Sequence, residues 1–111
     1  MENWLKIFPL HNIHIVDGEN LISNPAYELR AVEEFLDLQP VITADQFIID
    51  ANKGFPCVKG AELKPHCLPA SKGRHHPSIS VELLLRLRHF YSHENEKFFR
   101  LLNRRFNWFS I

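Results

Sequence analysis

The chain has 111 residues, which suits one small domain or part of a larger one. Its 45% hydrophobic and 23% charged residues are ordinary for a folded soluble chain. No apolar run approaches the length of a membrane span, and the N-terminus lacks the basic start and apolar stretch of a signal peptide. The net charge of zero hides a split of −7 (two basic, nine acidic) over residues 1–52 and +7 (eleven basic, four acidic) over 53–111, so either one face meets an anion or the acidic half packs on the basic half.

The first residues predict the end of a helix followed by a strand. Residues 4–9 (WLKIFP) are typical of a helix that a proline stops, so we expect the chain to be a piece of a longer domain. Residues 12–17 (NIHIVD) include three β-branched residues and are followed by Gly18, which predicts a strand in a central position of a sheet. His14 lies in this strand, and we interpret it as a packed or half-exposed side chain rather than a catalytic base.

Residues 23–36 predict a helix. Ser23 and Asn24 provide a cap, Pro25 suits the first turn, and the Gln-Pro pair at 39–40 ends the segment. The apolar side chains of this segment are spaced as a stripe, which places its glutamates largely outside the packed face. A strand followed by a helix implies an α/β layer rather than an all-helical bundle.

Residues 47–50 and 55–58 predict a short hairpin whose turn uses Asn52 and Gly54. Pro56 cannot donate a ladder hydrogen bond, so we expect the second strand to lie at an edge of the sheet. Residues 59–79 contain several Gly and Pro residues and predict a long irregular loop, a kind of segment that is usually functional or disordered.

The last third of the chain predicts two helices and an aromatic tail. Ser80 caps a helix that continues to Tyr91, and a second helical pattern begins at about Glu94. Residues 106–109 (FNWF) are expected to dock on the core.

Cys57 and Cys67 enclose nine residues and have three possible states. A disulfide suits a loop without a core of its own, stabilises the fold by about 2–3 kcal/mol in the chain-entropy model, and requires an oxidising compartment. A zinc half-site would recruit His66, His75 or His76, although the spacing matches none of the usual zinc patterns. Free structural thiols are the third state.

Residues 71–77 (SKGRHHP) follow directly and can bind an anion. Gly73 allows close approach of the backbone to a ligand, Lys72 offers a point charge, Arg74 offers a planar fork for phosphate oxygens, and Ser71 adds a hydroxyl donor. The alternative is a solvated basic turn, which is a common feature of protein surfaces.

Several short motifs occur together in one order. The central ones are residues 53–57 (KGFPC), Cys67, residues 71–74 (SKGR) and residues 76–77 (HP), and further matches lie at 4–10, 13–18, 21–25, 97–99 and 106–108. This constellation resembles the C-terminal region of heparan sulfate glucosamine 3-O-sulfotransferases, and less closely that of the related N-sulfotransferases. The resemblance covers nearly all 111 residues.

The resemblance implies an activity, a fold and a location. Members of the family transfer a sulfuryl group from 3′-phosphoadenosine 5′-phosphosulfate to a glucosamine 3-hydroxyl of heparan sulfate. Their fold is a P-loop-like α/β sandwich with a parallel sheet, flanking helices and a disulfide-bordered loop. Residues 1–111 would be the C-terminal portion of a single sulfotransferase domain in the Golgi lumen, with a membrane anchor only if an upstream segment exists and without a nucleic acid partner.

The resemblance also implies roles by position. Cys57 and Cys67 would be the disulfide pair, and no metal is implied. Among the basic residues of the chain, Lys53 and Lys59 are the ones we expect to touch the sulfated glycan. Pro56 occupies a nucleotide-contacting position that is Tyr in some relatives. The residues expected to bind the nucleotide are Pro56, Ser71, Lys72, Gly73, Arg74, His75 and His76.

The family's phosphate-binding loop, its catalytic Glu and the Arg–Ser pair that grips the 3′-phosphate correspond to nothing in these 111 residues. We therefore assign no catalytic residue to this chain and expect no measurable activity from it alone. Two other functions stay open: a non-catalytic, disulfide-stapled basic module that binds heparan sulfate or nucleotide, and a small zinc-dependent interaction domain.

Overall fold

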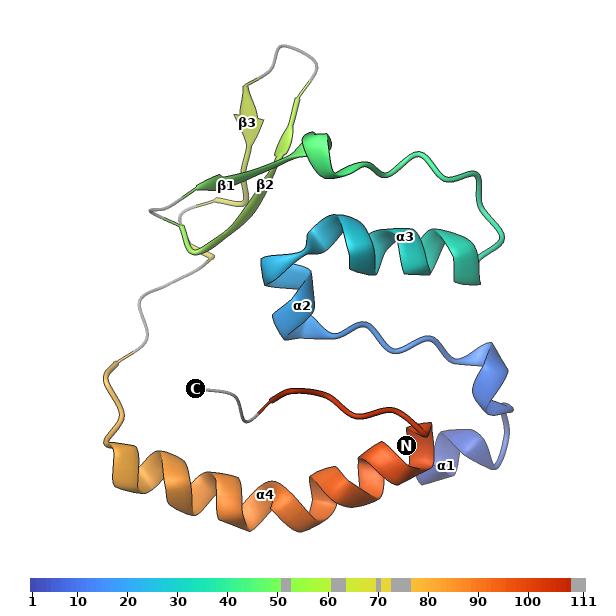
Figure 1. Cartoon of the computed structure of the whole chain (residues 1–111), viewed down its shortest axis with the longest axis vertical. Helices are drawn as coiled ribbons and strands as arrows, with labels where there is room; N and C mark the ends of the chain where they lie inside the picture. The colour runs from blue at the N-terminus through green and yellow to red at the C-terminus, as the bar shows by residue number, and fades with distance from the viewer. Residues whose placement is uncertain (51–52, 61–63, 70, 73–76, 109–111) are drawn as a thin grey trace. The chain divides into compact units, whose positions relative to one another are not determined.

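A computed structural model of the chain describes residues 1–50, 53–60, 64–69, 71–72 and 77–108 (Figure 1). The chain divides into two compact units, one formed by residues 1–13 and 76–111 and the other by residues 14–75. The elements in chain order are α1 (Glu2–Leu5), η1 (Leu10–Asn12), α2 (Gly18–Ser23), α3 (Pro25–Phe35), η2 (Ala44–Gln46), β1 (Phe47–Asp50), β2 (Phe55–Lys59), β3 (Pro65–His66) and α4 (Val81–Leu102).

The strand predicted at residues 12–17 is wrong. Ile13 is extended, with φ −125° and ψ 116°, but the sheet of the described residues contains only β1, β2 and β3. Asp17 caps α2 instead, because its carboxylate accepts hydrogen bonds from the backbone N–H groups of Glu19 (3.1 Å) and Asn20 (3.4 Å). The β-branched residues thus indicate extended backbone, but a β-strand also requires hydrogen bonds to a neighbouring strand.

Helix α3 confirms the predicted start at Pro25, but its buried side is not the predicted apolar stripe. Ala26, Glu28 and Glu33 are buried, whereas Tyr27 and Phe35 are exposed. The prediction that the glutamates lie outside the packed face is therefore wrong for Glu28 and Glu33. Both carboxylates are buried because backbone N–H groups of neighbouring loops donate hydrogen bonds to them.

Strands β1 and β2 form the predicted antiparallel hairpin. The register pairs Phe47 with Val58 and Asp50 with Phe55, and Gly54 in the turn has a φ of +69°, a conformation that glycine adopts without steric cost. Helix α2 packs against α3 and β2, and η2 packs against α3. Asn52 lies outside the described residues, so its predicted part in the turn stays a prediction.

Strand β2 is the middle strand of the sheet, so the predicted edge position is wrong (Figure 1). Strand β3 pairs antiparallel with the far end of β2 only, at Val58 and Lys59. Pro56 lies before this segment, opposite Ile49 of β1, so its missing N–H does not interrupt the β2–β3 ladder. All pairs of this sheet are antiparallel, and the expected parallel sheet is not found among the described residues.

Residues 81–102 form one helix, α4, rather than two. Ser80 caps it as predicted, since its hydroxyl accepts a hydrogen bond from the Leu83 N–H at 3.3 Å. The predicted break between Tyr91 and Glu94 is wrong, because the intervening residues include neither Gly nor Pro and nothing interrupts the backbone hydrogen bonds. The helix ends at Asn103, which adopts a left-handed conformation with φ 48° and turns the chain back.

The aromatic tail packs on the end of α4 as predicted for Phe106 and Trp108, while Phe109 lies outside the described residues. Phe106 is 6% exposed and stacks on Trp108 and Phe98 with ring centroids 4.9 Å and 6.1 Å apart, while Phe99 packs against both tail rings. Arg104 lies over the Phe106 ring, 4.5 Å from its centroid. These aromatic contacts form the core of the first unit.

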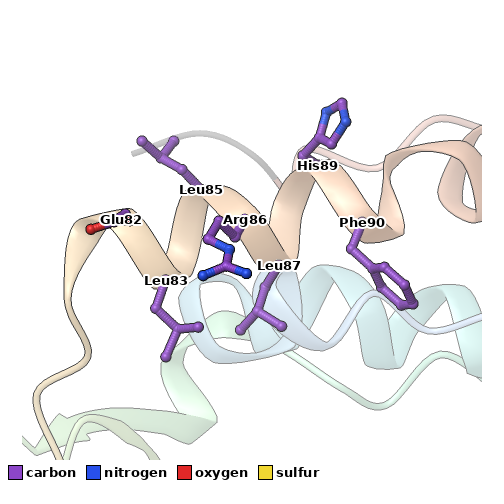
Figure 2. A pocket seen from close by; sticks show the side chains of 7 residues that line it. All are labelled: Glu82, Leu83, Leu85, Arg86, Leu87, His89 and Phe90. Atoms are coloured by element: carbon purple, nitrogen blue, oxygen red, sulfur yellow. The ribbon is translucent and has the colours of Figure 1, made fainter.

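The first half of α4 exposes many apolar side chains. Leu83, Leu87 and Phe90 project from one side of the helix, and Leu85 projects from the opposite side (Figure 2). Glu82, Arg86 and His89 lie among these side chains on the same helix, and in the described part of the chain no side chain of another element joins them. A membrane-spanning helix is absent from the described residues, because even α4, with 22 residues, carries too many charges.

Candidate nucleotide-binding loop

A disulfide joins the sheet to the loop that follows it. Cys57 on β2 and Cys67 just after β3 are bonded, with an S–S distance of 2.06 Å and a Cα–Cα distance of 4.6 Å. Cys57 is 1% exposed, so the bond is anchored in the core of the second unit. The implied disulfide is thereby confirmed, and neither sulfur is available as the thiolate ligand that the zinc alternative requires.

Part of the predicted irregular loop between the two cysteines is the short strand β3. The Gly60 N–H, just after β2, donates a hydrogen bond of 2.9 Å to the carbonyl of Lys64, just before β3. A Cβ atom on Gly60 would lie 3.3 Å from that same oxygen, so the position has little room for a side chain. The pairing of β3 with β2 therefore brings Cys67 close to Cys57 in the middle strand.

Lys53 extends from the β1–β2 turn to the loop beyond the disulfide. Its Nζ donates a hydrogen bond of 2.7 Å to the carbonyl oxygen of Leu68, 15 residues further along the chain. The turn that carries Lys53 is held by the Asp50 carbonyl, which accepts from the N–H groups of Lys53 (3.1 Å) and Gly54 (3.3 Å). Although we expected Lys53 to contact the glycan, its ammonium group is hydrogen-bonded to the backbone of this chain.

The predicted anion-binding residues begin at a turn just past Leu68. The Lys72 N–H donates a hydrogen bond of 2.9 Å to the Pro69 carbonyl, and the side chains of Ser71 and Lys72 are exposed. A hydroxyl donor and an ammonium group next to each other on an exposed turn suit phosphate oxygens. Gly73, Arg74, His75 and His76 lie outside the described residues, so their contacts with a nucleotide stay predictions.

Pro56 and Lys59, the remaining predicted site residues, both lie on β2. Pro56 is half-buried, and Lys59 is exposed at the end of the strand, opposite Pro65. The pKa of the nearby Asp45 carboxyl is lowered, chiefly by a hydrogen bond with the Thr43 side chain and in part by the Lys59 ammonium. Lys59 therefore has an acidic neighbour, although its side chain stays accessible to solvent.

The family model described as "Sulfotransferase domain" matches residues 1–100. The chain belongs to the sulfotransferase family. Among curated sulfotransferases, heparan sulfate glucosamine 3-O-sulfotransferase 3B1 of Mus musculus is 49% identical over 110 residues, and the 3B1 protein of Homo sapiens is 46% identical over the same length. Each alignment covers 97% of this chain, and the chain spans less than a third of these relatives, 28% of each.

A relative of lower identity aligns over the same share of this chain. Heparan sulfate glucosamine 3-O-sulfotransferase 5 of Mus musculus is 41% identical over 108 residues, again 97% of this chain and 31% of the relative. The expected similarity to heparan sulfate glucosamine 3-O-sulfotransferases is thus confirmed over almost the whole chain.

Two features of the loop were not anticipated from the sequence of this sulfotransferase chain. The Lys53–Leu68 hydrogen bond has no sequence signal, because it joins a side chain to a backbone carbonyl across 15 residues. The short strand β3 also escaped detection, since two residues, Pro65 and His66, are too few to produce a periodic pattern.

Proposed function

We propose that the full-length protein transfers a sulfuryl group from 3′-phosphoadenosine 5′-phosphosulfate to a glucosamine 3-hydroxyl of heparan sulfate. Residues 1–111 form the C-terminal part of its single sulfotransferase domain. The observation that carries this proposal is the similarity, at up to 49% identity over 97% of the chain, to proteins named as heparan sulfate glucosamine 3-O-sulfotransferases. A P-loop-like fold with a parallel sheet belongs to the same proposal, the sheet being formed by residues outside the described ones.

The loop after Cys67 supplies cations to the nucleotide in this proposal. Sulfuryl transfer, like phosphoryl transfer, depends on positioning the donor and neutralising the negative charge around an in-line transition state. Lys72 gives a point charge and Arg74 a planar fork for phosphate oxygens, with Ser71, Gly73, His75 and His76 around them. Pro56 contributes a ring edge or its backbone, since it has neither an aromatic ring nor a hydroxyl.

The glycan contact in this proposal falls to Lys59. Its exposed ammonium at the end of β2 is suited to a sulfate or carboxylate group of heparan sulfate. The acceptor base and the main phosphate-binding loop are not among these 111 residues, so the chain by itself has no turnover in this account.

A Golgi lumenal location is part of the proposal. Disulfides persist in oxidising compartments, and the Cys57–Cys67 bond closes the loop that directly precedes the turn of Ser71 and Lys72. Reduction should loosen the loop and weaken nucleotide binding, whereas a thiol-containing cytosol would not maintain the bond.

The transfer assay with the full-length protein tests the proposal. We expect sulfate from radiolabelled 3′-phosphoadenosine 5′-phosphosulfate to appear on the glucosamine 3-hydroxyl of heparan sulfate. Binding of nucleotide and glycan without transfer would favour the alternative, a non-catalytic basic module. The coding sequence upstream of Met1 distinguishes the same two functions, because only the enzyme needs a phosphate-binding loop and an acceptor base there.

A further inference from the structure

Two links fasten the loop that carries Ser71 and Lys72 to the hairpin. The disulfide holds position 67 to β2, and Lys53 holds the carbonyl of position 68 to the β1–β2 turn. The links start from different residues of the hairpin, Cys57 and Lys53, and they end on neighbouring residues of the loop. One covalent link alone leaves the loop free to rotate about it, whereas two links from separate points fix its direction.

The path from Leu68 to the candidate phosphate ligand is short. Pro69 follows Leu68 with its φ restricted by the ring, and the Pro69 carbonyl accepts the hydrogen bond of the Lys72 N–H at 2.9 Å. A change in the orientation of the Leu68 peptide therefore passes directly to the turn that carries Lys72. The hydrogen bond from the Lys53 ammonium is charge-assisted, which makes it stronger than one between neutral groups.

We propose that Lys53 is a positioning residue that orients the Ser71–Lys72 turn toward the nucleotide, and not a glycan contact. This inference rests on the proposed function. The Lys53 ammonium group has three N–H donors, and one of them bonds to the Leu68 carbonyl. The Asp50 carbonyl accepts hydrogen bonds from the backbone of the turn that carries Lys53, which fixes the start of the side chain. Lys53 then affects nucleotide binding through the loop, without touching the nucleotide.

The experiment uses the full-length protein with Lys53→Met, Lys53→Arg and the matched variant Lys59→Met from the same hairpin. Affinities for adenosine 3′,5′-bisphosphate and for heparan sulfate are measured separately by titration calorimetry. We expect Lys53→Met to weaken nucleotide binding about 10-fold, as the loss of a charged hydrogen bond implies, and to leave glycan affinity unchanged. Lys53→Arg should restore most of the nucleotide affinity, and Lys59→Met should lower only the glycan affinity.

Amide hydrogen exchange gives a second readout that does not depend on affinity. Exchange of the Lys72 amide should accelerate in Lys53→Met and return toward the original rate in Lys53→Arg. If Lys53→Met does not fold, Lys53→Gln, a shorter neutral donor, replaces it in both measurements, with a smaller expected effect. A loss of glycan affinity at unchanged nucleotide affinity overturns the inference, as does an unchanged Lys72 exchange rate.

A further variant separates failure of this inference from failure of the proposed function. Lys72→Glu removes a proposed phosphate contact directly. If Lys72→Glu weakens nucleotide binding and Lys53→Met does not, the positioning role is wrong and the proposed function stands. If neither change affects nucleotide binding, the proposed nucleotide site is itself wrong.

Discussion

Glu28 and Glu33 hold loops to α3 through buried carboxylates. Glu28 is 2% exposed and accepts hydrogen bonds from the Asp17 N–H (3.1 Å) and the Asn20 side-chain amide (2.7 Å). Glu33 accepts from the backbone N–H groups of Val41 (3.0 Å) and Ile42 (3.2 Å). Periodicity could not reveal this arrangement, because the donors lie 8 to 11 residues away, outside α3 itself.

Substitution of Glu33 tests this role at the residue scale. Glu33→Ala should lower the free energy of unfolding by about 1–3 kcal/mol, because it leaves two part-buried backbone donors without their acceptor. Glu33→Gln keeps one acceptor oxygen and should cost less. The adjacent exposed Glu34→Ala serves as control, with an effect within about 0.5 kcal/mol. Urea denaturation of the full-length protein measures all three, and equal stability of the Glu33 and Glu34 variants would refute the account.

The elements that sequence could predict are those with local signals. The Pro25 start of α3, the β1–β2 hairpin and the Ser80 cap depend on residues close together in sequence, and all three are confirmed. The strand at residues 12–17 and the edge position of β2 depend on which segments become neighbours, and both were wrong. In the candidate site, the disulfide was implied by resemblance alone, since spacing left three states of the cysteines open.

The end of α4 gives a prediction about pH at the element scale. A hydrogen bond from the Arg105 guanidinium lowers the pKa of the Glu96 carboxyl, and the Nη1–Oε2 distance is 3.1 Å. Because the folded pKa is depressed, this contribution to stability is present above the ordinary Glu pKa and disappears as the pH falls through the lowered value. Both groups are exposed, so the effect is small and screened by salt.

A comparison of the full-length protein with Glu96→Gln measures this dependence. The difference in unfolding free energy should be largest near neutral pH and should disappear as the pH falls through the lowered pKa of Glu96, where the carboxylate becomes protonated in the folded as well as the unfolded chain. Added salt should reduce the difference at neutral pH. A difference that grows on acidification would have the wrong sign for a carboxyl with a lowered pKa.

At the scale of the whole molecule, the exposed apolar surface is large for a chain of 111 residues. Phe90 is 72% exposed, and Val81, Leu83, Leu84 and Leu87 are also exposed on α4, while Leu85 is exposed on its opposite side. The chain also aligns to less than a third of its relatives. Monomeric soluble proteins rarely leave contiguous apolar patches of this kind uncovered. Such a surface is consistent with the proposal that further residues of one sulfotransferase domain cover it.

The isolated 111-residue chain should therefore be poorly soluble and inactive in sulfate transfer. We expect binding of an apolar dye and broad amide signals, because the exposed side chains of α4 promote association. The full-length protein should bind less dye per molecule. A sharp, well-dispersed amide spectrum or clear turnover from the isolated chain would show that no further residues are needed.

The central claim is that a disulfide-anchored turn presents Lys72 and Arg74 to the phosphates of a nucleotide. Titration of the full-length protein with adenosine 3′,5′-bisphosphate, before and after Lys72→Glu with Arg74→Glu, tests it most directly. The double change Arg86→Glu with Arg100→Glu on α4 alters the net charge equally and is the control. Each of the two substitutions removes one charged hydrogen bond in this account, so it predicts a loss of affinity of about 100-fold or more for the loop variant. It predicts little change for the control. Unchanged affinity of the loop variant would contradict it.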